Sequence, residues 1–120
     1  MKRCIAIGSF VALAAFAQAG QFKSVFITGN HGPVHILDNE LMVIRNFTQD
    51  TAGSSRGYVT FNNRDSDRIN VLTASIIDST APEGSQEVIN SIIIAGPAIV
   101  NFHCEDTGAR CFATFKIDSN

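Results

Sequence analysis

The chain has 120 residues, of which 45% are hydrophobic and 17% are charged, and its formal net charge at pH 7 is −2. This length corresponds to one domain. Beyond Lys2 and Arg3, the lysines and arginines are scattered singly without a basic patch, which argues against binding to nucleic acid or to an anionic membrane surface.

Residues 1–19 have the features of a secretory signal peptide. Lys2 and Arg3 precede an apolar segment, Cys4–Phe16, which is followed by Ala17-Gln18-Ala19. A basic start, a short apolar core and a small-residue motif predict cleavage after residue 19. A membrane anchor is the alternative, because the uncharged run is long enough to span a bilayer, but the small-residue motif favours cleavage. We therefore expect an extracellular, secreted β domain of residues 20–120, with a formal charge of −4 once Lys2 and Arg3 are removed.

The mature chain opens with an alternating segment, Phe22–Thr28, which predicts a short strand. It runs into Gly29–Pro33, a dense turn signal. His31 and His35 lie in and beside this turn, where they suggest either a metal or pH-sensitive site or two loop histidines. Zinc needs three or four ligands and no others are apparent nearby, so we interpret them as loop histidines.

A clear strand pattern follows at Leu41–Phe47, with an Asn-x-Thr acceptor, Asn46-Phe47-Thr48, at its end. Behind a signal peptide this motif predicts glycosylation of Asn46 and places residues 46–48 on the surface. The polar, Gly- and Ser-rich residues 48–56 are typical of a surface loop.

The segment Ile69–Ile77 is apolar on both alternating faces, which predicts a central strand buried on two sides. Short strands alternate with loops rich in Gly, Pro, Asn and Asp, and no long window shows helical periodicity. The sequence therefore predicts an all-β fold, a small single-domain antiparallel sandwich or barrel of about six to eight short strands.

The most regular alternation lies in residues 98–104 and 111–117, on either side of a polar tip. The pattern predicts a β-hairpin that turns at Thr107-Gly108 and buries one face. In this register Cys104 lies opposite Cys111, and Glu105 lies opposite Arg110. Two facing cysteines in a secreted chain predict a disulfide.

The outward face of this hairpin carries His103 and Phe112, which form a candidate contact surface for a partner. A redox role for Cys104 and Cys111 is disfavoured, because their spacing is not Cys-x-x-Cys. A metal role needs more ligands, and His103 points away from Cys104.

Motifs of catalysis are absent from the sequence. Serines occur outside any Gly-x-Ser-x-Gly motif, and neither a phosphate-binding loop nor an EF-hand loop is present. Paired acids such as Asp65 and Asp67 lie in turn-like, solvated sequence. We expect no enzyme activity, no cofactor and no metal site.

The sequence has nine phenylalanines and no tryptophan, which suggests a further hypothesis, that the protein carries small apolar ligands. Seven of the nine lie in strand segments of the mature chain, and we interpret them as core, apart from Phe112.

Several segments together resemble the multiprotein bridging factor 2 family, a family of small secreted arthropod proteins. They are Ile69–Asp78 (INVLTASIID), Asn90–Ala98 (NSIIIAGPA), Ile99–Phe102, the closing CFATFKI, and the regions Gly29–Gly32 and Leu41–Val43. Ala74 and Asp78 fit the family's Ala-x-x-x-Asp-type strand end, and Gly96-Pro97 stands where the family has a glycine turn. The chain differs in having one glycine there and in placing cysteines around its last tip.

This resemblance implies a secreted protein of salivary or haemolymph type. The family's founding role is a transcriptional co-activator that bridges a DNA-binding factor and the general transcription machinery, and this role is the alternative function. A signal peptide, a disulfide and an acidic chain favour the first. We expect a non-catalytic protein that binds a protein or small ligand outside the cell, in a salivary, haemolymph or defence-related setting.

Overall fold

The computed structural model describes residues 20–50, 55–63, 67–78, 85–86, 90–106 and 108–120. The predicted signal peptide, residues 1–19, lies outside the described residues, as does part of the predicted loop 48–56. The described residues form strands and turns, and none of them is helical, which confirms the all-β prediction. Within these ranges no helix is long and apolar enough to cross a membrane.

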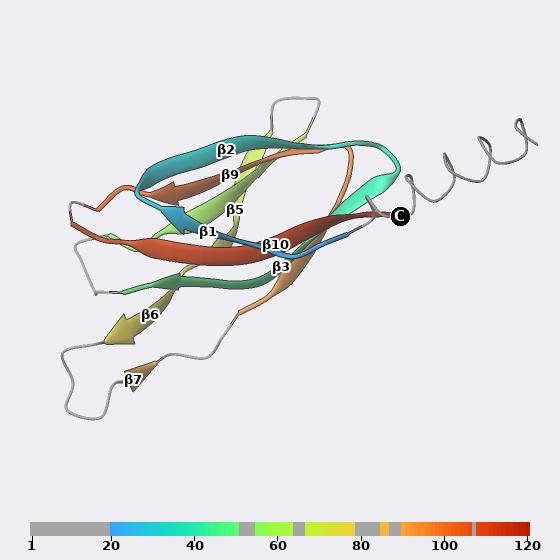
Figure 1. Cartoon of the computed structure of the whole chain (residues 1–120). Coiled ribbons are helices and arrows are strands. Elements are labelled where there is room, and N and C mark those ends of the chain that lie inside the picture. The colour runs from blue at the N-terminus through green and yellow to red at the C-terminus, as the bar shows by residue number, and fades with distance from the viewer. Residues whose placement is uncertain (1–19, 51–54, 64–66, 79–84, 87–89, 107) are drawn as a thin grey trace, which may run out of the picture.

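Within the described ranges, ten strands form two sheets that face each other as the layers of a sandwich (Figure 1). Sheet A has the order β1 (Lys23–Ile27), β10 (Cys111–Ser119), β3 (Glu40–Gln49), β6 (Ser75–Asp78) and β7 (Ser85–Gln86), with β8 (Ile92–Ala95) also paired to β3. Sheet B has the order β2 (Gly29–Ile36), β9 (Ala98–Cys104), β4 (Tyr58–Asn62) and β5 (Arg68–Thr73). All the pairs are antiparallel except β3 with β6. The fold is thus a sandwich rather than a barrel, and it has more strands than the six to eight expected from the sequence.

The core lies between the sheets and centres on three aromatic rings. Phe102 of β9 is fully buried, with its ring centroid 5.8 Å from that of Phe47 and 5.3 Å from that of Phe115. These rings come from both sheets, so their packing holds the two layers together. Every second residue of β9 is buried, as expected for a strand with one face on the core.

The predicted hairpin is wrong. β9 pairs with β2 and β4 in sheet B, whereas β10 pairs with β1 and β3 in sheet A. The chain therefore crosses from one sheet to the other between Cys104 and Cys111. Alternation alone does not distinguish the two arrangements, because inward residues face each other across the core just as they would neighbour each other in a hairpin.

The single central strand predicted at Ile69–Ile77 is also wrong. It divides at Ala74 into β5, an edge strand of sheet B, and β6, which belongs to sheet A. Ala74 is buried at this crossing, where its amide donates to the carbonyl of Gly57 at 2.8 Å. The apolar character on both faces thus reflects a change of sheet rather than burial on two sides.

Irregularities in β2 and β3 change the alternation of inward and outward residues that the sequence predicts. Gly29–Pro33, predicted as a turn, belongs to edge strand β2, whose register with β9 shifts between His31 and Val34. On β3 the pairing shifts at Arg45, which forms a bulge between Ile44 and Asn46. The bulge reverses the alternation, so that Phe47 faces the core together with Met42 and Ile44.

Candidate functional site

A disulfide joins the two sheets at one end of the sandwich. Cys104 ends β9 and Cys111 begins β10, and their sulfur atoms are bonded with the Cα atoms 6.1 Å apart. Both cysteines are buried. The predicted pairing of Cys104 with Cys111 is thus confirmed, although it links two layers rather than two arms of a hairpin.

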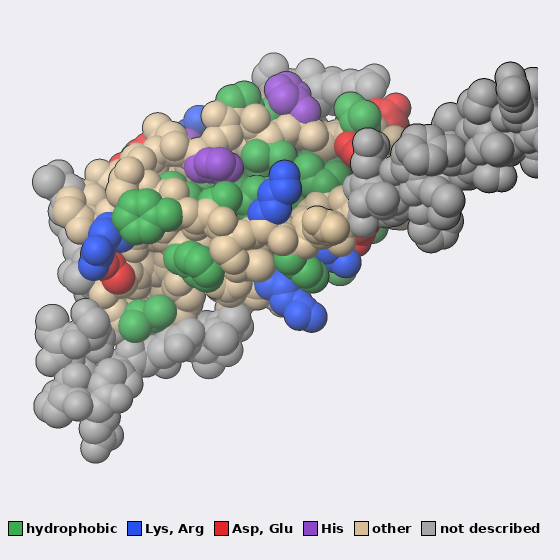
Figure 2. Space-filling model, viewed as in Figure 1, with side chains coloured by type: hydrophobic (Ala, Val, Ile, Leu, Met, Phe, Trp, Pro, Cys, Tyr) green, Lys and Arg blue, Asp and Glu red, His purple; other side chains and the backbone are tan. Residues whose placement is uncertain are grey.

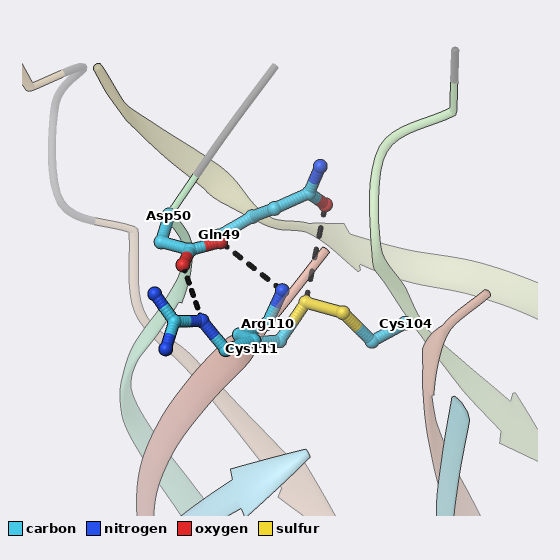
Figure 3. A network of polar contacts seen from close by, with 5 residues as sticks. All are labelled: Gln49, Asp50, Cys104, Arg110 and Cys111. Carbon is cyan, nitrogen blue, oxygen red and sulfur yellow. Dashed lines mark hydrogen bonds and ion pairs between the residues drawn. A yellow bond between two sulfur atoms is a disulfide. The ribbon is translucent and has the colours of Figure 1, made fainter. Parts of the chain in front are cut away.

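The side chain of Gln49, from β3, lies against the disulfide in the interior (Figure 3). Its side chain is 1% exposed, and its Oε1 atom accepts a hydrogen bond from the amide of Gly57 at 2.7 Å. The same oxygen lies 3.9 Å from Sγ of Cys111; this is a contact, since an oxidised sulfur has no proton to donate. Gln49 therefore satisfies the backbone beside the disulfide and fixes the end of β3 against it.

An ion pair closes the same end of sheet A. Nε of Arg110 lies 2.7 Å from Oδ2 of Asp50, and the Arg110 amide donates to Oδ1 at 3.1 Å (Figure 3). Burial raises the pKa of the Asp50 carboxyl, but these hydrogen bonds and the charge of Arg110 outweigh it, so the pKa lies below its ordinary value of 3.8. Arg110 thus pairs with Asp50, whereas the predicted hairpin register had placed Glu105 opposite it.

The outer face of sheet A carries an exposed apolar patch beside this ion pair. Phe26 of β1 and Phe112 of β10 are direct partners in the antiparallel register and are 65% and 43% exposed. Together with Ile77 of β6 they line a shallow hollow of about 280 Å³, whose polar side is formed by Asp50 and Arg110. We call Phe26, Ile77 and Phe112 the phenylalanine patch.

His103 lies on the outer face of sheet B, on the opposite side of the sandwich from Phe112. Its ring stacks on Tyr58 with centroids 4.5 Å apart, and its two nitrogens lie 2.9 Å from Oδ1 of Asn30 and 3.2 Å from Oγ1 of Thr60. Glu105 is 3.4 Å from Nδ1 of the same ring. The structure therefore does not bring His103 and Phe112 into one contact surface, and the contacts of His103 brace three strands of sheet B.

Asn46, the predicted glycosylation site, lies within β3 and is half-buried, while Phe47 and Thr48 are buried. Asn46 pairs with Thr114 and Thr48 pairs with Phe112, so both lie on the outer face of sheet A. A glycan at Asn46 would thus emerge next to the phenylalanine patch. Glycosylation itself stays a prediction.

Sequence reasoning identified Phe112 as an outward aromatic residue but assigned its partner Phe26 to the core. The alternation of Phe22, Ser24 and Phe26 was the available signal, because Val25 and Ile27 occupy the inward positions. Phe22 is also exposed. Cζ of Arg45 and Nζ of Lys116 lie over its ring, 5.2 and 4.8 Å from the ring centroid, as in cation–π contacts. No signal pointed to Asp50, whose partner is 60 residues away.

Comparison with known proteins adds no relative to this picture: no family model and no curated protein matches the chain. Among the described residues, no group of three or more His, Cys, Asp and Glu side chains is placed to hold a metal ion.

Proposed function

We propose that the chain is a non-catalytic, secreted protein that binds a partner protein outside the cell through the phenylalanine patch. The observation that carries the proposal is the pairing of two exposed phenylalanine rings, Phe26 and Phe112, on the outer face of sheet A. Exposed aromatic rings beside a charged pair are typical of the centre of a protein interface, where they supply most of the binding energy.

The surroundings of the patch favour a protein partner. The hollow is shallow and lies on a sheet surface. An aromatic or aliphatic side chain of a partner protein could therefore make a broad contact with it. Asp50 and Arg110 form a polar rim that can exchange hydrogen bonds with a partner's backbone or charged side chains. We therefore expect a partner with an apolar centre and polar flanks.

The disulfide between Cys104 and Cys111 supports an extracellular setting, because disulfides persist in oxidising compartments. The basic and apolar start of the sequence supports export. Membership of the multiprotein bridging factor 2 family, with a salivary or haemolymph role, is part of the same proposal and rests on the sequence resemblance alone.

Export is tested by intact mass spectrometry of the chain secreted from a eukaryotic host, before and after reduction and removal of N-linked glycans. We expect a chain that begins at Gly20, gains two hydrogen atoms on reduction and becomes lighter on deglycosylation. A full-length chain with free thiols, retained inside the cell, would overturn the extracellular function.

The binding surface is tested by comparing capture of extracellular proteins on immobilised wild type, Phe26→Ser, Phe112→Ser and Ile69→Ser. Ile69 is a matched control, since it is 59% exposed but belongs to sheet B. We expect both phenylalanine variants to keep the circular dichroism of the wild type and to lose at least roughly ten-fold in affinity, as for a central aromatic contact. Equal binding by all four proteins, or equal loss in Ile69→Ser, would contradict the proposal.

A further inference from the structure

A second hollow lies at the side of the sandwich, between the edge strands β1 and β2. Its volume is about 390 Å³, within the usual range for small-molecule sites. The lining residues are Gln21, Lys23, His35, Glu40, Phe115, Lys116 and Ile117. We call this hollow the lateral cleft. Figure 2 shows hydrophobic surface between histidine and Lys or Arg side chains on the side of the molecule where β1 and β2 lie (Figure 1).

The floor of the lateral cleft is apolar and packs on the core. Phe115 is 8% exposed and stacks on Phe102 of the opposite sheet, and the ring of His31 lies 6.3 Å from it. Ile117, two residues along β10, packs against the same core. An apolar chain laid in the cleft would therefore contact side chains that the core already holds in place.

Lys23 reaches the cleft from its edge. Lys23 is the register partner of Phe115, and paired residues of antiparallel strands point to the same face of a sheet. Its ammonium therefore leaves β1 on the inward side, above the apolar floor, and no ion-pair partner for it is found within the described ranges. An inward charge on an edge strand also discourages edge-to-edge pairing, a role compatible with ligand binding.

The other charged groups at the cleft already have contacts. The ammonium of Lys116 lies 2.8 Å from the carboxylate of Asp118 and over the ring of Phe22. Oε1 of Glu40 accepts a hydrogen bond from the amide of Leu37 at 2.9 Å. Lys23 is thus the group placed to attract a negative charge into the lateral cleft.

We propose that the lateral cleft binds a free amphipathic carboxylate of the medium-chain fatty-acid type. The hydrocarbon chain lies against Phe115 and Ile117, and the carboxylate pairs with Lys23. The combination of one cation and an apolar floor fits this chemistry, because neither a purely apolar molecule nor a small inorganic anion would use both. The site is separate from the phenylalanine patch, which lies on the outer face of sheet A.

The probe is dodecanoate, titrated below its micelle concentration into the mature, disulfide-bonded protein and followed by isothermal calorimetry and amide NMR shifts. We expect saturable binding, with the largest shifts at Lys23 and at Phe115–Ile117. Lys23→Gln should weaken dodecanoate binding roughly three- to ten-fold, as for a partly solvated ion pair, whereas Lys23→Arg should restore it. Arg68→Gln on the distant strand β5 is the matched control and should bind as the wild type does.

Dodecanol provides the complementary probe, because it carries the same hydrocarbon chain without the charge. Its binding should be weaker than that of dodecanoate and equal in wild type and Lys23→Gln. The proposal is overturned by absence of saturable dodecanoate binding, by shifts confined to another face, by an unchanged affinity in Lys23→Gln, or by binding only to anionic phospholipid vesicles. Phe112→Ser should retain dodecanoate binding, so that failure of the lateral cleft and failure of the phenylalanine patch give different results.

Discussion

The disulfide between Cys104 and Cys111 joins the last residue of β9, in sheet B, to the first residue of β10, in sheet A. Only six residues separate them along the chain, and those residues carry the crossing between the layers. The disulfide therefore fixes the spacing and relative position of the sheets at the end where Gln49, Asp50 and Arg110 also lie.

The first prediction concerns this disulfide. The double variant Cys104→Ala/Cys111→Ala should lose about 2–3 kcal/mol of unfolding free energy. The disulfide closes a short loop, so it lowers the conformational entropy of the unfolded chain by only a modest amount. Urea unfolding monitored by circular dichroism measures the change. Wild type in reducing buffer serves as the control and should show a similar loss, whereas an unchanged midpoint in both would show that core packing alone holds the layers together.

The second prediction concerns Gly57, which is buried beneath the disulfide. A methyl group at this position would meet the carbonyl oxygen of His103 at 2.9 Å and both Sγ of Cys111 and Cζ of Phe47 at 3.2 Å. Gly57→Ala should therefore destabilise the protein by about 1–3 kcal/mol through overpacking.

Gly108→Asn is the matched control for Gly57→Ala. A side chain at Gly108 would meet nothing within 4 Å, and its φ of 81° lies in the left-handed region that asparagine tolerates. Thermal unfolding should show the smaller loss in Gly108→Asn. The reverse order would contradict the close approach at Gly57.

The third prediction concerns the ion pair of Asp50 and Arg110. Because folding lowers the pKa of Asp50, the pair stabilises the native state at pH values above about 3.8, and this stabilisation is lost as the pH falls through the lower folded pKa. Asp50→Asn should cost less than about 1 kcal/mol near neutral pH, since both side chains are partly exposed, and should flatten the acid limb of the stability profile.

A double-mutant cycle controls this experiment. Arg110→Gln should produce a similar loss near neutral pH, and the double variant Asp50→Asn/Arg110→Gln should lose little more than either single variant. Strictly additive losses would show that the two side chains do not stabilise one another. Urea unfolding across the acid range provides the measurement.

The fourth prediction separates core from patch phenylalanines. Phe102→Ala should cost about 3–5 kcal/mol, because a fully buried ring that contacts both Phe47 and Phe115 leaves a cavity. Phe112→Ala should cost less than about 1 kcal/mol, because the residue is already 43% exposed and lies outside the core. Equilibrium denaturation of both variants measures the difference, and equal losses would place Phe112 in the core.

Local alternation predicted which residues of β9 and β10 face inward but not which sheet each strand joins. Val100, Phe102 and Cys104 are buried as expected, and so are Cys111 and Ala113. Sheet membership depends on pairings with β1, β2, β3 and β4, whose paired residues lie 37 or more positions away and leave no local signature. The disulfide was predictable because both arrangements bring the two cysteines together.

The candidate site was predictable in part for the same reason. Phe112 falls on the outward side of a regular strand, so alternation alone exposes it. The remaining parts of the hollow, Phe26, Ile77 and Asp50, come from three other strands or strand ends and meet Phe112 only through tertiary pairing. Arg45 shows a further limit of prediction from the sequence. Its bulge changes which residues of β3 face inward, but no Gly or Pro in this strand indicates a bulge.

The position of β10 between β1 and β3 in sheet A has a consequence for how the protein is made. Among the described strands, β1 pairs in this sheet with β10 alone, and the longest pairing of β3 is with β10. Sheet A therefore cannot close until residues 111–119 have left the ribosome, although β1 and β3 were synthesised long before. In the secreted protein that we propose, β3 lacks its β10 neighbour during that interval, so translation would set the time available for attaching a glycan to Asn46 before sheet A is complete.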